Sequence, residues 1–285
     1  VSLVFKAFGI SPCNLEQATD TMVLSIRPLP TASLGGTAVI CEGSPTALSV
    51  NLTGTPPWSI TYSSGAQNFV INNILVSPYT FNVSPTITTA YTLQAVSDQF
   101  CSGVSFGGTA LVTVNPLPLP FLLSATGNGQ YCQGTAGVEL VLGGSEQGIV
   151  YQLMYGSQAL GVPRAGTGNA ISFGYVSNPG VYHVVASNPL TNCSLQMPGN
   201  VTVSIIPLPI VDFVSDTACL GSPTTFTLTG ASVQNLVSCA WLFGDGGSAT
   251  YAGPANAVYT YQAYGNYNAS VTVTDVNGCQ RTIGH

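Results

Sequence analysis

A three-residue signature, Pro-Leu-Pro, occurs three times at nearly equal intervals in this chain of 285 residues. The copies occupy 28–30, 116–118 and 207–209, so they begin 88 and 91 residues apart. Each copy follows a run in which apolar residues alternate with other residues, at 22–26, 110–114 and 201–205. Such alternation is typical of a β-strand with one face packed inward. The chain is therefore predicted to be a tandem array of domains, each closing on a strand and followed by a proline-stiffened linker.

Cysteines recur with the same period. One member of each pair sits in a repeated Cys-x-Gly-Ser/Thr turn, and the other follows 60 or 61 residues later, 14 or 15 residues before the next Pro-Leu-Pro. Close Cys or His pairs of the kind that bind zinc are lacking. Disulfides within each domain, formed in an oxidising compartment, are the favoured interpretation. The predicted pairs are Cys41 with Cys101, Cys132 with Cys193, and Cys219 with Cys279.

Two cysteines stand outside these pairs. Cys13 lies 15 residues before Pro28, so it has the spacing of a second member without its partner. Cys239 breaks the rhythm and leaves three pairings open in the last domain. Cys239 is either free or a competitor for Cys279, and pairing of Cys219 with Cys279 is favoured by analogy with the other domains.

The composition narrows the function classes. Only 5% of the residues are charged and the net charge is −6, so the clustered Lys and Arg of a nucleic-acid interface are absent. Apolar runs are short and fall well below the ~20 residues of a membrane-spanning helix. We expect an exported protein that neither spans a membrane nor binds nucleic acid.

The strongest motif lies near the end of the sequence. It comprises Trp-Leu-Phe-Gly-Asp-Gly at 241–246, Tyr-Thr-Tyr at 259–261, Gly-Asn-Tyr at 265–267, and Val-Thr-Val-Thr-Asp-Val-Asn-Gly-Cys at 271–279. This resembles the polycystic-kidney-disease (PKD) type of immunoglobulin-like domain. The residues expected to maintain the fold are two core anchors, a tight turn, and two tyrosines whose hydroxyls reach backbone groups. They are Trp241 and Phe243, then Gly244, Asp245 and Gly246, then Tyr261 and Tyr267.

The middle of the chain resembles repeats of giant surface proteins of Bacteroidota, through the segments 54–62, 77–81 and 88–93. That resemblance implies export by type IX secretion and a place among gliding-motility adhesins or cell-surface filaments. The expected fold class is all-β, with tandem immunoglobulin-like (PKD-type) sandwiches in an extended array. The expected divisions are a truncated domain's closing strands at 1–30, domains at 31–118 and 119–209, and a PKD-like domain at 210–285 that lacks its last strand.

A search for chemistry finds little. The ten carboxylates are scattered, and neither of the two histidines accompanies a nucleophile motif, so we expect no enzyme and no cofactor. Calcium at Asp245 and Asp275 is the weaker alternative to aspartates that bond to their own turns, because there is no Asp-x-Asp-x-Asp loop. Trp58 is expected to pack in the core or at an edge rather than to stack on sugar. Thr21 and Thr217 lie in Asp-Thr-apolar tripeptides that resemble the O-glycosylation site of Bacteroidota, with chance occurrence as the alternative.

The resulting hypothesis is a non-catalytic stalk or adhesin segment of a large secreted cell-surface protein, acting as spacer and contact array. Its expected partners are neighbouring repeats of the same polypeptide, with weak contacts to glycans or surfaces. The alternatives are a subunit of an extracellular filament and a carbohydrate-binding accessory module of a secreted hydrolase.

Overall fold

The computed structural model describes residues 2–8, 17–23 and 25–285. Within these ranges the regular structure consists of β-strands and two short 3₁₀ helices, Thr126–Gly129 and Val233–Asn235, with no α-helix. The prediction of an all-β fold built from immunoglobulin-like sandwiches is confirmed. None of the helices in the described ranges has the length and apolar character needed to cross a membrane. The chain divides into two compact units, Val1–Leu117 and Pro118–His285.

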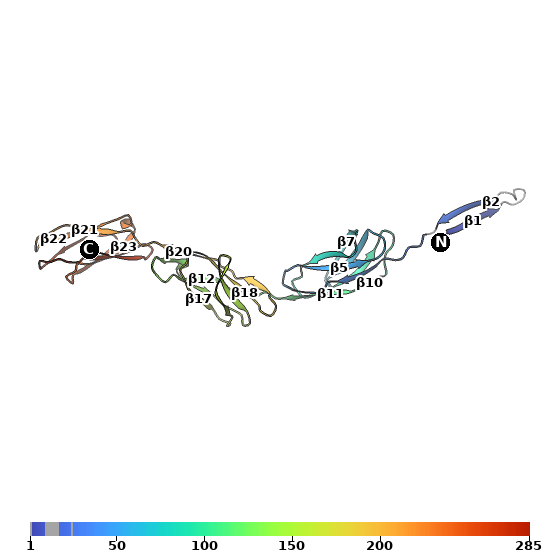
Figure 1. Ribbon diagram of the computed structural model, residues 1–285, viewed down its shortest axis with the longest axis horizontal. Coiled ribbons are helices and arrows are strands. Elements are labelled where there is room, and N and C mark those ends of the chain that lie inside the picture. The colour runs from blue at the N-terminus through green and yellow to red at the C-terminus, as the bar shows by residue number, and fades with distance from the viewer. Residues whose placement is uncertain (1, 9–16, 24) are drawn as a thin grey trace. The chain divides into compact units, whose positions relative to one another are not determined.

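The first unit contains a hairpin and a sandwich. The hairpin pairs β1 (Ser2–Phe8) with β2 (Gln17–Val23) in antiparallel register. The sandwich has one sheet in the order β10-β3-β5-β8 and a second in the order β4-β11-β9-β6-β7, several of which are labelled in Figure 1. Its strands are β3 (Thr31–Gly35), β4 (Ala38–Cys41), β5 (Thr46–Leu52), β6 (Trp58–Ser63), β7 (Asn68–Ile74), β8 (Tyr79–Val83), β9 (Thr89–Ser97), β10 (Ser105–Gly107) and β11 (Thr109–Asn115).

The core of this sandwich follows from strand alternation. In β5, Leu48, Val50 and Leu52 are buried while the residues between them are not, because successive side chains point to opposite faces of a sheet. Trp58 is 7% exposed and its indole N–H donates to the Thr53 carbonyl at 3.0 Å. The predicted packing role of Trp58 is confirmed.

The second unit begins with a sandwich of the same design. Its sheets run β12-β14-β17 and β13-β20-β18-β15-β16, with β19 paired to β18. A separate hydrophobic core lies between them, around Leu140, Tyr151 and Tyr182. The strands are β12 (Leu123–Ala125), β13 (Gln130–Cys132), β14 (Val138–Leu142), β15 (Val150–Tyr155), β16 (Gln158–Ala165), β17 (Ile171–Val176), β18 (Gly180–Ser187), β19 (Ser194–Gln196) and β20 (Val201–Ile206).

The remaining strands form two sheets around a third core, which is centred on Trp241. The sheets run β21-β22-β25 and β24-β23-β26-β27. The strands are β21 (Asp212–Ser215), β22 (Pro223–Thr229), β23 (Leu236–Leu242), β24 (Ser248–Ala252), β25 (Ala257–Thr260), β26 (Ser270–Asp275) and β27 (Gln280–Gly284).

The predicted closing strands can be compared with the observed ones. The runs 110–114 and 201–205 lie within β11 and β20, so these two predictions are confirmed. In the run 22–26, only Met22 and Val23 belong to β2, and Ser25 and Ile26 lie outside any strand.

The end of the last sandwich needs a correction. We expected this domain to lack its final strand, but β27 pairs with β26 from Thr274↔Gln280 to Ser270↔Gly284 and so covers that edge. The difference from its neighbours lies elsewhere. Strands β4 and β13 pair in parallel with β11 and β20, whereas the corresponding segment 216–219 forms no strand.

Candidate functional site at the domain junction

A disulfide joins Cys132 to Cys279 inside the second unit, with their Cα atoms 5.5 Å apart. Cys132 ends β13 of one sandwich, and Cys279 follows β26 of the next, so the bond spans 147 residues of sequence. The linker 207–209 also runs between these two sandwiches. Two covalent connections therefore hold the same pair of domains together.

Cys132 lies where the chain leaves its sandwich. Strand β13 pairs in parallel with β20, so Cys132 is opposite Ile206, the last residue before the linker. The N–H of Gln133 donates to the Ile206 carbonyl at 2.9 Å, and the N–H of Thr135 donates to the Cys132 carbonyl at 3.1 Å. We call this arrangement the exit turn.

Cys279 lies where the chain enters the following sandwich. The carboxylate of Asp275, which is 7% exposed, accepts hydrogen bonds from the N–H groups of Asn277 at 2.9 Å and Cys279 at 2.8 Å. The Asp275 N–H donates to the Cys279 carbonyl at 3.0 Å, which closes the loop 275–279. The guanidinium of Arg281, two residues further on, donates to the Pro209 carbonyl of the linker at 3.2 Å. We call this arrangement the entry loop.

The exit turn occurs in all three sandwiches. The bond from Thr135 to Cys132 has counterparts from Ser44 to Cys41 at 2.9 Å and from Ser222 to Cys219 at 2.8 Å. In the first sandwich the N–H of Glu42 also donates to the carbonyl of Asn115, the last residue of β11, as Gln133 does to Ile206. The first member of each sequence pair is therefore an exit-turn cysteine.

The entry loop also occurs three times. The bond from Asp275 to Cys279 has counterparts from Asp98 to Cys101 and from Asn188 to Cys193, both at 2.9 Å. In each loop the Asp or Asn side-chain oxygen accepts at least one backbone N–H. Sequence reasoning passed over these residues, although an Asp or Asn three to five residues before the cysteine was a visible signal.

The predicted pairing within domains is wrong. Cys132 is bonded to Cys279, and Cys101 and Cys219 are free thiols, so none of the three predicted pairs forms. Cys41 and Cys193 each take part in a disulfide. Cys239 is a free thiol in the core of the last sandwich and donates to the Gly253 carbonyl at 2.9 Å. Cys13 lies outside the described residues.

The reason is that the two cysteines of a domain lie at opposite ends of its sandwich. In the middle domain, β18 separates them: Gly180 pairs near the exit end of β20, and Ser187 precedes the entry loop. Eight residues at about 3.3 Å each make β18 roughly 23 Å long between its end Cα atoms. A disulfide requires Cα atoms within about 7 Å. Cys132 and Cys193 therefore cannot meet.

The PKD motif lies in the core of the last sandwich. Trp241 and Phe243 are 0% and 1% exposed, in agreement with their predicted role as anchors. Gly244 and Gly246 have φ of +87° and +95°. At Gly244 an added Cβ would stand 2.7 Å from the Asn268 carbonyl oxygen, so only glycine fits this close approach.

The motif tyrosines reach backbone groups as predicted. The Tyr261 hydroxyl donates to the Phe243 carbonyl at 2.8 Å, and the Tyr267 hydroxyl donates to the Ala263 carbonyl at 2.9 Å. The two rings stack with centroids 4.2 Å apart. Burial raises the pKa of the Tyr261 hydroxyl, which keeps it a donor at physiological pH.

The aspartates considered for calcium are used by their own turns. Asp245 accepts the Gly247 N–H and the Tyr259 hydroxyl, both at 2.9 Å. The hydrogen bond from Tyr259 to this carboxylate raises the pKa of the Tyr259 hydroxyl. Asp275 holds the entry loop as described. The described residues contain no group of three or more His, Cys, Asp or Glu side chains arranged for a metal.

Of the two glycosylation candidates, Thr217 is exposed beside Asp216, whose carboxylate accepts the Thr225 N–H at 2.8 Å. Thr21 lies in β2 opposite Val4. Modification of either threonine stays a prediction.

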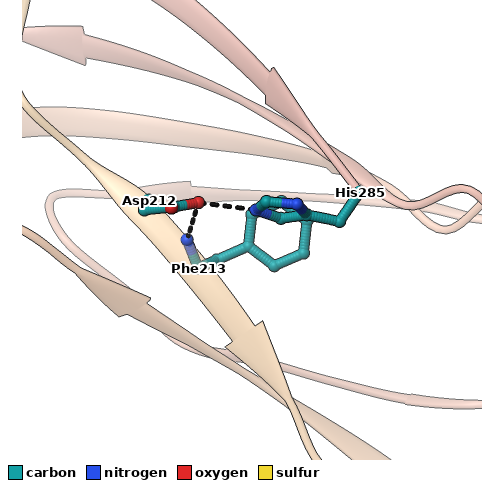
Figure 2. A network of polar contacts seen from close by, with 3 residues as sticks. All are labelled: Asp212, Phe213 and His285. Carbon is teal, nitrogen blue, oxygen red and sulfur yellow. Dashed lines mark hydrogen bonds and ion pairs between the residues drawn. The ribbon is translucent and has the colours of Figure 1, made fainter.

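One polar contact was not anticipated from the sequence. The Nε2 atom of His285 lies 2.6 Å from an oxygen of Asp212, and the His285 ring packs edge-on against Phe213 with centroids 4.7 Å apart (Figure 2). The hydrogen bond with His285, followed by the N–H of Phe213, lowers the pKa of the Asp212 carboxyl. The two polar side chains are more than half exposed, so the contact ties the end of the chain to β21 without forming a buried site.

Known proteins match parts of the chain. Residues 207–284 match the PKD domain family, and residues 29–105 match the Ig-like domain of nucleoporin POM152. No curated protein matches the sequence. The chain therefore contains immunoglobulin-like and PKD-type domains in tandem.

Several solved structures resemble the chain at low sequence identity. One, from work on host cell-surface retention of a 1.5-MDa bacterial ice-binding adhesin, is 13% identical, with a TM-score of 0.39 over 90% of this chain and 96% of that one. The full ectodomain of mouse nectin-like molecule 4 is also 13% identical, with a TM-score of 0.34 over 88% and 96%. A Bacteroides ovatus protein, SGBP-B in complex with a mixed-linkage heptasaccharide, is 15% identical, with a TM-score of 0.23 over 91% and 64%.

Proposed function

We propose that this chain is a non-catalytic stalk or adhesin segment of a large secreted bacterial cell-surface protein, in which it serves as a spacer and a contact array. The observation that carries this proposal is the Cys132–Cys279 bond across a domain boundary. A disulfide inside one domain would stabilise that domain alone, whereas this one restrains the joint between two domains.

The bond changes the path that tension takes through the chain. Under tension, force that enters the middle domain near its first strand passes along the backbone to Cys132, through the disulfide to Cys279, and out through β27. The residues between the two cysteines lie in a closed covalent loop and are not stretched. Their fully extended length would be roughly 500 Å, at about 3.4 Å per residue. Most of both sandwiches would therefore stay folded under a load that would unravel an ordinary tandem array.

The linker supports the same role. Its two prolines at 207 and 209 fix φ and favour an extended backbone. Arg281 holds the Pro209 carbonyl, so the following domain also grips the linker through a side chain. Together with the disulfide, these contacts favour a joint that resists rotation as well as extension.

We place the protein outside the cell, because structural disulfides persist in oxidising compartments. Export by type IX secretion in Bacteroidota, a role in gliding motility, and weak contacts with glycans or substratum belong to this proposal. The PKD match and the disulfides support it as far as the kind of domain and the compartment are concerned.

The test is single-molecule force extension of the full chain with bio-orthogonal handles at position 119, whose side chain is 56% exposed, and at the C-terminal residue. We expect Cys132→Ser to release up to roughly 500 Å of additional extension relative to the unchanged chain. Cys219→Ser, which alters a free and exposed thiol, is the matched control and should release none. Equal extension in all three chains would rule out a load path through the bond.

A further inference from the structure

Two cysteines occupy the same places as the bonded pair but have no partner thiol. Cys219 lies in the exit turn of the last sandwich, the position that Cys132 has in the middle one. Cys101 lies in the entry loop of the first sandwich, the position that Cys279 has in the last one. Their structural counterparts are bonded to each other in this same chain.

The exit turn of Cys219 is open to a partner. Cys219 is exposed and borders a groove together with Tyr261 and Ala269, at the end of the sandwich away from Cys279. The Ser222 N–H donates to its carbonyl at 2.8 Å, so the turn is already formed. The thiol is accessible without any rearrangement of this domain.

The entry loop of Cys101 also faces the incoming linker. The guanidinium of Arg27, one residue before the first Pro-Leu-Pro, lies 3.7 Å above the ring of Phe100. The Asp98 carboxylate accepts the N–H groups of Phe100 and Cys101, both at 2.8 Å. At the bonded joint the corresponding loop contacts its linker through Arg281 and Pro209. Both entry loops are therefore set beside the end from which a preceding domain approaches.

We infer that Cys219 and Cys101 are the two complementary halves of an interdomain disulfide of the Cys132–Cys279 type, each taking a cysteine from another module of this kind. An exit-turn thiol bonds to the entry-loop thiol of the module that follows it, and the module comes either from the same polypeptide or from a second copy. This inference deepens the proposed stalk function and rests on it.

The bond forms by ordinary thiol–disulfide exchange. The thiolate of one cysteine attacks the glutathione-capped sulfur of the other and expels glutathione thiolate, so one S–S bond forms as another breaks. Overall, two protein thiols lose two electrons and two protons. Glutathione disulfide takes them up and becomes two molecules of glutathione.

The experiment compares a fused chain with two separate chains. His285 is six residues after Cys279, and Thr19 is six residues after Cys13, so residue 20 continues the repeat in register after residue 285. The fused chain is therefore residues 1–285 followed by residues 20–285. Its first copy carries Cys101→Ser and its second copy Cys219→Ser, which leaves one exit–entry pair of free positions. Cys13→Ser is present wherever residue 13 is retained.

The unfused arm mixes the Cys101→Ser chain with the Cys219→Ser chain at ~10 µM. Both arms are equilibrated in glutathione redox buffer, alkylated, digested and mapped without reduction. We expect the Cys219–Cys101 peptide in the fused chain, at about 100-fold higher yield than in the mixture, because an effective concentration of order 1 mM favours the bond within one chain.

Each outcome decides the question. The bond in the fused chain alone assigns the partner to a following module of the same polypeptide, and the bond in both arms adds a second copy as a source. Free Cys219 and Cys101 in both arms, or Cys219–Cys219 dimers in place of the mixed pair, would overturn the inference. The Cys132–Cys279 peptide is scored in the same digests, and its absence would count against the proposed function itself. Cys239, buried and free, should be alkylated only after denaturation and so reports that the last sandwich is folded.

Discussion

The first and last sandwiches differ in the state of one sulfur atom. Both contain an entry loop headed by an aspartate, and in both the aspartate N–H donates to the cysteine carbonyl at 2.9 or 3.0 Å. Cys279 is bonded and fully buried, whereas Cys101 is a free and half-buried thiol. The local structure of the loop therefore does not determine whether a bond forms. What determines it is whether an exit-turn cysteine of a preceding sandwich lies within reach.

The two sandwiches also differ in how they hold their tryptophans. The Trp58 indole N–H reaches the Thr53 carbonyl, whereas the Trp241 N–H is buried without a partner. Trp241 instead packs among aromatic rings, with Phe213 at 5.2 Å and Phe226 at 5.6 Å between centroids. The last sandwich thus relies more on ring packing and on its disulfide, and the first more on hydrogen bonds.

The largest expected effect comes from breaking that packing. Trp241→Ala should destabilise the last sandwich by about 3–5 kcal/mol, because it removes the largest fully buried side chain. Hydrogen exchange of β26 measures the loss. The substitution leaves Trp58 as the only tryptophan, so its fluorescence during chemical denaturation should show an unchanged first sandwich. A loss below about 1 kcal/mol would contradict the account of this core.

The next effect tests the disulfide. Cys132→Ser should lower the stability of the last sandwich by about 2–4 kcal/mol, because the bond restricts the unfolded chain. Denaturation is followed by Trp241 fluorescence in a Trp58→Phe background, where Trp241 is the only tryptophan. Cys219→Ser in the same background should leave the midpoint where it was. Equal midpoints for all variants would mean that the bond contributes nothing to this domain.

A smaller effect is expected at the head of the entry loop. Asp275→Ala removes the acceptor for two backbone N–H groups and should destabilise the last sandwich by about 1–3 kcal/mol. Asp98→Ala makes the equivalent change in the first sandwich. It should lower the Trp58 transition and leave the Trp241 transition unaltered, which tests whether the two loops act independently. A shift of both transitions by either substitution would contradict that independence.

The tyrosine hydroxyl contributes less. Tyr261→Phe removes one hydrogen bond to the Phe243 carbonyl and should lower the stability of the last sandwich by about 1 kcal/mol. Tyr264→Phe is the matched control, because Tyr264 is 91% exposed. The two variants are compared by urea denaturation. Equal stability would show that the hydroxyl of Tyr261 does not support the fold.

The smallest effect is a pH dependence in the first sandwich. The backbone N–H groups of Thr55, Phe100 and Cys101, together with Arg27, hold the pKa of the Asp98 carboxyl below its ordinary value of 3.8. Because the folded pKa is depressed, this stabilisation is complete above the ordinary value and is lost as the pH falls through the folded pKa. The Trp58 transition should therefore weaken below pH 3.8 in the unchanged chain and show less of that dependence in Asp98→Asn. An identical pH profile for both chains would argue against this role.

Much of this architecture can be predicted from the sequence, because it depends on local patterns. Alternation located β11 and β20, and the motif at 241–246 identified buried Trp241 and Phe243. The cysteine spacing correctly marked two recurring positions. Spacing alone does not tell at which end of a sandwich a position lies, so the pairing derived from it failed.

Strand direction would have provided the missing information. A cysteine that ends a strand parallel to the closing strand lies at the exit end, and a cysteine that follows the strand before the closing one lies at the entry end. The contact between Asp212 and His285 could not be found in this way, because it joins residues 73 apart that no local pattern relates.

The central claim is that disulfides of this chain cross domain boundaries. Its most direct test is non-reducing peptide mapping of the chain after alkylation of free thiols under native conditions and again after denaturation. The account predicts a linked peptide that contains Cys132 and Cys279, with Cys101 and Cys219 alkylated and Cys239 alkylated only on denaturation. A linked peptide that joins Cys132 to Cys193, or Cys219 to Cys279, would contradict it.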